Sequence, residues 1–363
     1  MTETTRWWLI SDLHLDGSEA SSDVARTLAA LVDVVVETEG PGGRHLVLLG
    51  DSFELATWSD EADEAVRRLT SIARRLPEVF ATLGRAVQSG AQVHLVCGNH
   101  DVDLMRPAVK RQLERLIAPA GTRGTGGVLV HPWMLLVPGV LYAEHGHQHH
   151  EPHRMPILLR ATTNASPGHA PPLAALVRAR GQGLGPVRVG RKVILAAWLS
   201  WRREREARRP WHQQLLGSCA RDLGLPAETL VGLHATSRFR PGRAVVAVGA
   251  RTLRRRIGRT GDPNGYLRRA ALRVDRVLGG RAERPACYVF GHTHVATLGD
   301  LPGSGRLFVN TGSWSMPAPE LPVVLVERSG GRTVVQLLSW PVPLRARRSP
   351  SRTNGTWRPE TEG

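Results

Sequence analysis

The chain has 363 residues, of which 48 are Lys or Arg and 32 are Asp or Glu, and its formal net charge is +16. An apolar share of 41% excludes a disordered or collagen-like chain, and the length suits one large domain or two ordinary ones. The three cysteines, Cys97, Cys219 and Cys287, are too few and too scattered for a disulfide framework or a thiolate zinc site. We therefore expect a reducing compartment.

The N-terminal segment lacks the cationic start and apolar stretch of a secretory signal peptide. The longest apolar tract, residues 128–143, is shorter than the roughly 20 residues that a membrane-spanning helix needs. We predict a cytoplasmic protein. Its positive charge is concentrated, because residues 151–285 hold 27 basic and 8 acidic residues whereas the rest of the chain holds 21 and 24. A charge confined to one segment indicates a surface rather than a general composition.

The first hundred residues alternate between two hydrophobic patterns. Short apolar runs at residues 6–10, 45–49 and 93–97 predict buried strands. Between them, apolar residues recur at helical spacing over residues 24–35 and 61–89, the second helix being broken or kinked at Pro77. Polar residues follow each strand. This order is typical of an α/β sheet with a site at the carboxyl ends of its strands.

The remainder of the chain predicts two further regions. Short apolar runs separated by turn residues predict a second sheet, with strands at residues 128–130, 135–137, 140–143, 287–290, 307–309, 323–326 and 334–338. Residues 154–284 instead favour a basic helical insertion, with its clearest helices at 192–209 and 266–278. We therefore predict a core formed by residues 1–153 and 285–344, interrupted by this insertion, and a disordered tail at 345–363.

The polar residues at the predicted strand ends are of the types that ligate metals or transfer protons. They are Asp12, His14, Asp51, Asn99, His100, His145, His292 and His294. A two-metal hydrolytic centre needs a bridging carboxylate with imidazole and oxygen ligands around it, and this set provides them. Asp12 and His14 are two residues apart, as are His292 and His294, so on an extended backbone each pair would point the same way and could bind one ion.

Five motifs in this order resemble the calcineurin-like metallophosphoesterases. They are Asp-x-His at 12–14, Gly-Asp-x-x-Glu at 50–54, Gly-Asn-His-Asp at 98–101, His-Gly-His at 145–147 and Gly-His-x-His at 291–294. The resemblance covers residues 6–150 and 286 to about 340. It implies an α/β fold, a four-layer sandwich of two mixed β-sheets flanked by helices, to which this chain adds a large helical insertion.

The same resemblance implies roles for the site residues. One divalent ion would be held by Asp12, His14 and His294, the second by Asn99, His145 and His292, and Asp51 would bridge both. A bridging water would attack phosphorus while His100, which stays off the metals, stabilises the charge that develops. The acidic partner of His100 would be Glu54 or Asp101. Mixed nitrogen and oxygen ligation suits manganese, our first choice, and also iron, zinc or cobalt.

Within that superfamily the chain is most similar to the UDP-2,3-diacylglucosamine diphosphatases, through residues 11–15, residues 50–55 and a helical insertion ahead of the last motif. It carries His100 and His147 where those enzymes carry Arg and Asp. We therefore expect hydrolysis of a phosphoester or pyrophosphate bond in a phosphorylated small molecule or lipid, such as a lipid-linked or nucleotide-sugar substrate.

The basic insertion permits several interpretations. Residues 192–211 combine tryptophans with arginines and could lie on an anionic membrane as a peripheral contact, or pack on neighbouring helices. The arginines at 251–256 could instead bind nucleic acid, which would favour a metal-dependent nuclease or phosphodiesterase. A non-catalytic scaffold is disfavoured by the complete ligand set. The histidine cluster at 147–153 favours a solvated loop over additional metal ligands. Residues 310–314 form either the rim of the site or a structural turn. The oligomeric state stays open.

Overall fold

A computed structural model describes residues 3–38, 42–56, 62–117, 127–150, 153–154, 226–236, 262–281, 284–315, 318, 320–341 and 351–357. The chain divides into two compact units. The first is formed by residues 1–57, 61–145 and 280–363, and the second by residues 58–60 and 146–279. Among the described helices, none combines the length and the apolar character that crossing a membrane requires.

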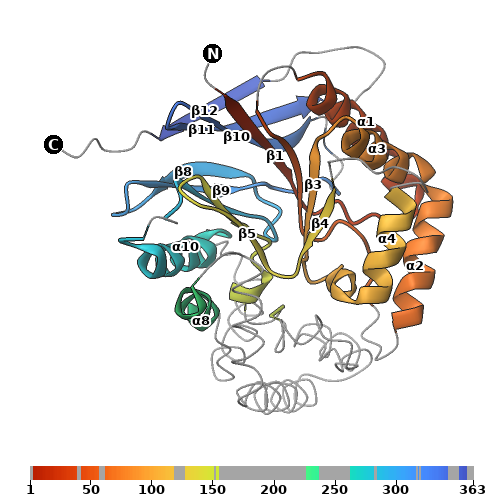
Figure 1. The fold of residues 1–363 in the computed structure, drawn as a ribbon, viewed down its shortest axis with the longest axis horizontal. Helices are drawn as coiled ribbons and strands as arrows, with labels where there is room; N and C mark the ends of the chain where they lie inside the picture. The colour runs from red at the N-terminus through yellow and green to blue at the C-terminus, as the bar shows by residue number, and fades with distance from the viewer. Residues whose placement is uncertain are drawn as a thin grey trace, which may run out of the picture. The chain divides into compact units, whose positions relative to one another are not determined.

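The first unit contains a seven-stranded sheet in the order β12-β11-β10-β1-β2-β3-β4 (Figure 1). Its strands are β1 (Thr4–Ile10), β2 (Arg44–Leu49), β3 (Gln92–Val96), β4 (Val128–His131), β10 (Glu320–Ser329), β11 (Arg332–Pro341) and β12 (Ser351–Trp357). Strands β1 to β4 run parallel, and β10 to β12 join them in antiparallel pairs. The three apolar runs predicted as strands near the N-terminus are therefore neighbours, with their carboxyl ends at one edge of the sheet.

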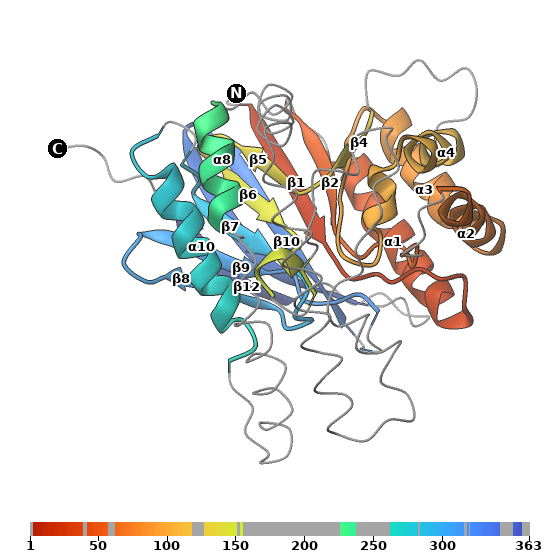
Figure 2. The same ribbon diagram turned by 90° about the horizontal axis from the view of Figure 1, so that it is seen from below.

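Four helices connect the parallel strands and lie on one side of this sheet (Figure 2). They are α1 (Glu19–Glu37), α2 (Ala62–Arg75), α3 (Pro77–Gln88) and α4 (Pro107–Ile117), with a short 3-10 turn, η1 (Val102–Met105), ahead of α4. Each buries an apolar stripe at helical spacing, as α1 does with Leu28, Leu31 and Val35. The predicted break at Pro77 is confirmed, because this proline begins α3, where its missing N–H costs no helical hydrogen bond.

A second sheet of five strands has the order β5-β6-β7-β9-β8. Its strands are β5 (Met134–Val137), β6 (Leu141–Glu144), β7 (Cys287–Phe290), β8 (Thr297–Leu301) and β9 (Arg306–Asn310). The two sheets share one apolar core, to which Leu9, Val47 and Val96 contribute from the first sheet and Ala143 and Val289 from the second. The predicted fold class, two mixed sheets flanked by helices, is confirmed.

Two sequence predictions about the strands are wrong. The strands at 128–131, 320–329 and 332–341 belong to the first sheet, because β4 pairs with β3 and β10 pairs with the free edge of β1. The tail is not disordered throughout, since residues 351–357 form β12. Pairing with β12 satisfies backbone groups that β11 would otherwise leave open at the edge of the sheet.

The second unit is described for three short elements, η2 (His147–His149), α8 (Ala227–Thr236) and α10 (Gly265–Leu278). The helix predicted at 266–278 is confirmed as α10. Helices α8 and α10 pack closely at Gly232, where an added Cβ would lie 2.9 Å from Val277 Cγ1. The predicted membrane-contacting segment, 192–211, and the arginine cluster at 251–256 lie outside the described residues.

Candidate metal centre

The candidate site lies where five strands of the first unit end. Asp12 and His14 follow β1, Asp51 and Glu54 follow β2, and residues 99–101 follow β3. The two remaining segments supply His145 after β6, and His292 and His294 after β7. Backbone hydrogen bonds of 3.0 Å from Asp12 N–H to Gly50 O and 2.9 Å from His14 N–H to Asp51 O hold the first two loops together.

The backbone at the site is left-handed at five residues. Among the described residues, the non-glycine ones with positive φ are Asp12 (54°), His14 (49°), Asp51 (51°), His292 (69°) and His294 (62°). All five are predicted ligands. A left-handed backbone costs a non-glycine residue roughly 1–3 kcal/mol and persists where the surroundings enforce it, commonly at functional sites. The extended backbone assumed for the two i, i+2 pairs is therefore wrong, because these loops turn sharply at each ligand.

Close packing explains two of the glycines in the motifs. A Cβ at Gly98 would lie 2.2 Å from Asp51 Oδ1, and one at Gly50, whose φ is +85°, would lie 2.5 Å from the ring of His145. Neither position can accept a side chain without displacing a site residue. The sequence expectation that these glycines let the backbone approach the site closely agrees with this packing.

Three groups of side chains that lie wholly within the first unit could each hold a cation, with ligand atoms within 4.8 Å of one another. The groups are Asp12, His14 and His294; Asp51, His145 and His292; and His14, Asp51 and His100. The first two correspond to the ligand sets that the family resemblance implies. The structure thus separates His292 from His294, although their spacing predicted a pair on one ion. The third group contains His100, which we expected to stay off the metals.

Distances within the first two groups show how their donor atoms converge. His294 Nε2 lies 3.0 Å from Asp12 Oδ1, and His14 Nε2 lies 3.9 Å from the same oxygen. In the second group, His145 Nε2 lies 3.1 Å from Asp51 Oδ2 and 3.3 Å from His292 Nδ1. His14 Nε2 is also 3.8 Å from Asp51 Oδ2, which places Asp51 between the two groups.

Buried polar atoms at the site test whether a cation would fit. Asp12 Oδ1, His14 Nε2 and Asn99 Oδ1 are buried, and none has a hydrogen-bond partner among the described residues. Such atoms are costly in a folded protein unless a ligand satisfies them. All three are oxygen or imidazole nitrogen donors of the kind that divalent cations accept. The residues present therefore fit a metal centre.

The charges at the site perturb its titrating groups strongly. Burial would lower the pKa of His145, but the carboxylates of Asp51 and Asp12 outweigh it and raise this pKa to about 10. Burial likewise opposes the charged form of Asp51, yet His145 and its neighbours hold the pKa of this carboxyl well below its usual range. Carboxylates and imidazoles thus stabilise each other's charge, as expected where groups are placed for catalysis or ligation.

Glu54, rather than Asp101, contacts His100. Glu54 Oε2 lies 2.9 Å from His100 Nδ1, and Glu54 Oε1 lies 2.5 Å from His14 Nδ1. Burial would lower the pKa of His100, but the hydrogen bond to Glu54 and the charge of Asp51 raise it to about 9. The second contact of Glu54, with His14, was not predicted, because nothing in the motif spacing indicates that one carboxylate serves two imidazoles.

Asp101 has a structural position instead. It is fully buried, and its two carboxylate oxygens accept hydrogen bonds from Gly98 N–H at 2.6 Å and Ser52 N–H at 2.7 Å. It thereby ties the loop after β3 to the loop after β2. The prediction of Asp101 as a catalytic candidate is therefore corrected, since both oxygens are engaged by backbone donors.

Further residues support the ligands through hydrogen bonds. Ser11 donates a hydrogen bond to Asp12 Oδ2, and its Oγ lies 2.6 Å from Thr311 Oγ1. Asn310 Nδ2 donates to Gly291 O at 2.9 Å and to Thr293 Oγ1 at 3.1 Å, which fixes the loop that carries His292 and His294. The segment at 310–314 is therefore a supporting turn, one of the two roles considered for it.

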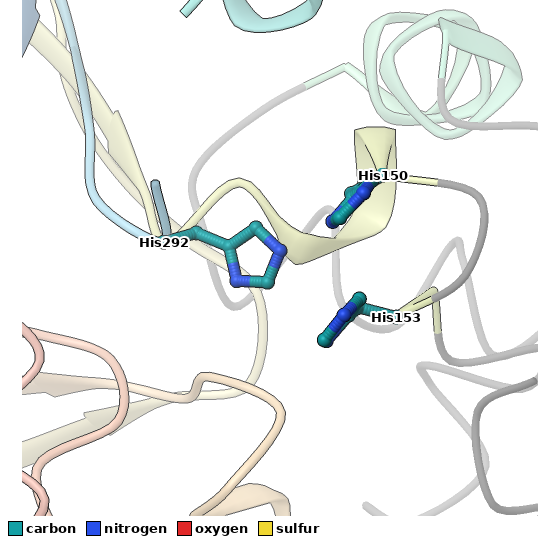
Figure 3. A group of neighbouring side chains, drawn as sticks. All are labelled: His150, His153 and His292. Carbon is teal, nitrogen blue, oxygen red and sulfur yellow. The ribbon is translucent and has the colours of Figure 1, made fainter. Parts of the chain in front are cut away.

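The histidine cluster past His145 belongs to the second unit. His147 is buried. The rings of His150 and His153 (Figure 3) stack, with centroids 4.7 Å apart. His150 also stacks on Tyr266 of α10, with a centroid distance of 5.1 Å. The predicted solvated loop is thus wrong for His147, whereas His149, His150 and His153 are half-buried.

Comparisons with known proteins give matches in structure alone. No protein-family model matches the chain, and no curated protein matches it in sequence. A conserved uncharacterised protein from Streptococcus pneumoniae TIGR4, described as a predicted phosphoesterase, is 13% identical with a TM-score of 0.30, covering 98% of this chain and 100% of that one. A Vps29 single mutant from Entamoeba histolytica is 11% identical with a TM-score of 0.31, covering 97% and 99%. Phosphopantetheinyl hydrolase from Mycobacterium tuberculosis is 14% identical with a TM-score of 0.26, covering 86% and 91%.

Proposed function

We propose that this protein is a metal-dependent hydrolase of phosphoester or pyrophosphate bonds. One observation carries the proposal: two aspartates and four histidines from four strand ends converge on one place. Asp12 Oδ1, His14 Nε2 and the nearby Asn99 Oδ1 are buried without a hydrogen-bond partner among the described residues, and these donor atoms suit divalent cations. The motif resemblance to the calcineurin-like metallophosphoesterases supports the same activity.

The chain's own residues have distinct tasks in this proposal. Asp12, His14 and His294 would hold one cation, Asn99, His145 and His292 a second, and Asp51 both. Two divalent cations, when bound, activate water for attack and neutralise charge on a phosphoryl group. His100 donates Nδ1–H to Glu54, and with its pKa raised to about 9 it keeps a proton on Nε2 at neutral pH. That proton is available to a phosphoryl oxygen or a leaving group.

The substrate class is the finer part of the proposal. The similarity to the UDP-2,3-diacylglucosamine diphosphatases supports a lipid-linked or nucleotide-sugar substrate, with manganese as the first metal to test. Residues 151–285 carry a net positive charge, which suits a substrate with several phosphate charges.

The test is hydrolysis by the manganese-loaded protein of a UDP-linked diacyl sugar, an aryl phosphodiester and single-stranded DNA, with Asp51→Asn as the blank. Metal-dependent turnover of any of the three that the blank lacks supports the hydrolase, and preference for the lipid nucleotide supports the substrate class. Cleavage of DNA alone would replace that class with nucleic acid. No turnover of any substrate under manganese, zinc, iron or cobalt would overturn the proposal.

A further inference from the structure

We propose that Glu54 is a positioning residue for two imidazoles at once, orienting the metal-ligand candidate His14 as well as its expected partner His100. This inference rests on the proposed metal centre. It assigns Glu54 a task toward the metal in addition to the pairing with His100 that the motif resemblance implies.

The geometry of the carboxylate carries the inference. Glu54 uses a different oxygen for each ring, Oε1 at 2.5 Å from His14 Nδ1 and Oε2 at 2.9 Å from His100 Nδ1. The two rings meet edge to face with centroids 4.7 Å apart, so both contacts form on one side of the site. An ionised carboxylate only accepts hydrogen bonds, and therefore both imidazoles must present Nδ1–H to it.

The consequence for His14 concerns its other nitrogen. With Nδ1–H held by Glu54, Nε2 points toward Asp12 Oδ1 at 3.9 Å and Asp51 Oδ2 at 3.8 Å, and it is buried without a hydrogen-bond partner among the described residues. This is the orientation that a ligating imidazole needs, because a hydrogen bond at one ring nitrogen fixes which nitrogen faces the metal. Glu54 is not itself a proposed metal ligand, but it orients His14 so that Nε2 can bind a cation.

Glutamine cannot replace glutamate in this arrangement. Its side chain offers one accepting oxygen and one donating NH₂ group, whereas the two rings both present donors. In Glu54→Gln, one imidazole therefore keeps its hydrogen bond and the other faces a second donor. Glu54→Ala removes both contacts. If Glu54 accepts hydrogen bonds from both rings, Glu54→Gln should therefore lose one of these hydrogen bonds and Glu54→Ala should lose both.

The first measurement uses the metal-free protein and needs no activity. Two downfield, slowly exchanging imidazole Nδ1–H protons should appear by NMR and be assigned through His14→Ala and His100→Ala. Glu54→Gln should remove one of them and Glu54→Ala both, whereas the control Glu64→Ala, on an exposed residue paired with Arg68, should keep both. Persistence of the His14 proton in Glu54→Ala would overturn the inference.

The second measurement is manganese binding by isothermal titration calorimetry. Loss of a hydrogen bond behind a metal ligand typically weakens affinity about 10- to 100-fold, so Glu54→Ala should bind more weakly by that factor, while His100→Ala and Glu64→Ala should match the unchanged protein. An affinity in Glu54→Ala equal to that of the unchanged protein would mean that Glu54 does not position His14, and the inference fails. An unchanged protein that binds no metal would sink the proposed function, while the NMR signals still decide the double contact of Glu54.

Discussion

Two groups of histidines in the first unit have opposite electrostatic surroundings. The metal-centre candidates lie beside carboxylates, and the pKa of fully buried His145 is raised to about 10. The other group, which we call the histidine ladder, consists of His45, His94 and His131 on the adjacent strands β2, β3 and β4. His94 Nε2 lies 3.0 Å from His45 Nδ1, and His94 Nδ1 lies 2.9 Å from His131 Nε2.

His94, the central member of the histidine ladder, is buried, and His45 and His131 are half-buried. Burial, followed by the neighbouring imidazoles, lowers the pKa of His94 to about 3, and burial and the charge of Lys110 lower that of His131 to about 4. Within the described chain no carboxylate pairs with any member of the ladder, and Trp7 stacks on His45. The comparison teaches that burial alone makes a histidine neutral and structural, whereas nearby carboxylates make a buried histidine available for a proton or a cation.

Replacing Asp51 with Asn should have the largest effect, because it removes the carboxylate that distinguishes the metal centre from the ladder. His145 Nε2 loses its partner at 3.1 Å, and the two ligand groups lose the side chain between them. We expect metal content to fall and turnover to drop by at least about 10³-fold, the upper range for losing one charge-stabilising group. Metal analysis and the hydrolysis assay measure this, with Asp33→Asn, at an exposed ion pair with Arg85, as the matched control. An active, metal-free Asp51→Asn protein would contradict the scheme.

Replacing His100 with Ala tests whether this imidazole acts as a proton donor rather than as a metal ligand. It removes a proton donor and leaves every carboxylate of the site in place, so we expect metal content to persist and the rate to fall by roughly 10²- to 10⁴-fold. The loss should appear in kcat at saturating metal. If metal is lost together with the rate, His100 belongs to the ligand set, as the grouping of His14, Asp51 and His100 allows.

Replacing Gly98 with Ala displaces Asp51 without changing its chemistry. The new Cβ would lie 2.2 Å from Asp51 Oδ1, a contact that requires a shift of the ligand or of the loop. Overpacking of this kind costs roughly 1–3 kcal/mol of unfolding free energy, and we expect weaker metal binding as well. Urea unfolding and calorimetry measure both quantities. Gly127→Ala is the control because its Cβ would meet nothing within 4 Å; equal behaviour of the two variants would show that Asp51 has room to move.

The same comparison explains what the sequence could and could not predict. The candidate ligands were identified because each follows a short apolar run, and strand ends of this kind gather at one edge of a sheet. Pairing of β10 with β1 was not predictable, since it joins segments over three hundred residues apart and depends on which edge of the sheet is free. The choice of Glu54 over Asp101 depends on the directions of side chains in the loops after β2 and β3, and residue spacing does not encode these directions.

The histidine ladder was also not predicted, for a different reason. Each of its members is a single histidine in or at the end of an apolar strand, with no motif around it. Only the parallel register, which sets His94 opposite Val47 and Leu129, brings the three rings into one hydrogen-bonded row.

The smallest expected effect is the pH dependence that the ladder gives to stability. The folded-state pKa of His94, about 3, lies below the ordinary value of about 6.5, so the unfolded chain takes up a proton first as the pH falls. The stability that neutral His94 contributes is present above pH 6.5 and is lost below it, by about 1 kcal/mol between pH 6.5 and 5.5. The site histidines with raised pKa values contribute more stability to the metal-free protein as the pH falls, which opposes the effect of the ladder. The contribution of the ladder must therefore be isolated by substitution.

The substitution His94→Leu isolates the contribution of the ladder to the pH dependence of stability. This variant should be less stable than the unchanged protein at pH 6.5, because His45 and His131 lose their shared partner. The difference in unfolding free energy between the two proteins should then narrow by about 1 kcal/mol at pH 5.5, since only the unchanged protein still loses stability through His94. Urea unfolding of both metal-free proteins at the two pH values measures the difference. A constant or widening gap would mean that His94 is protonated in the folded protein, and the contrast between the ladder and the metal centre would disappear.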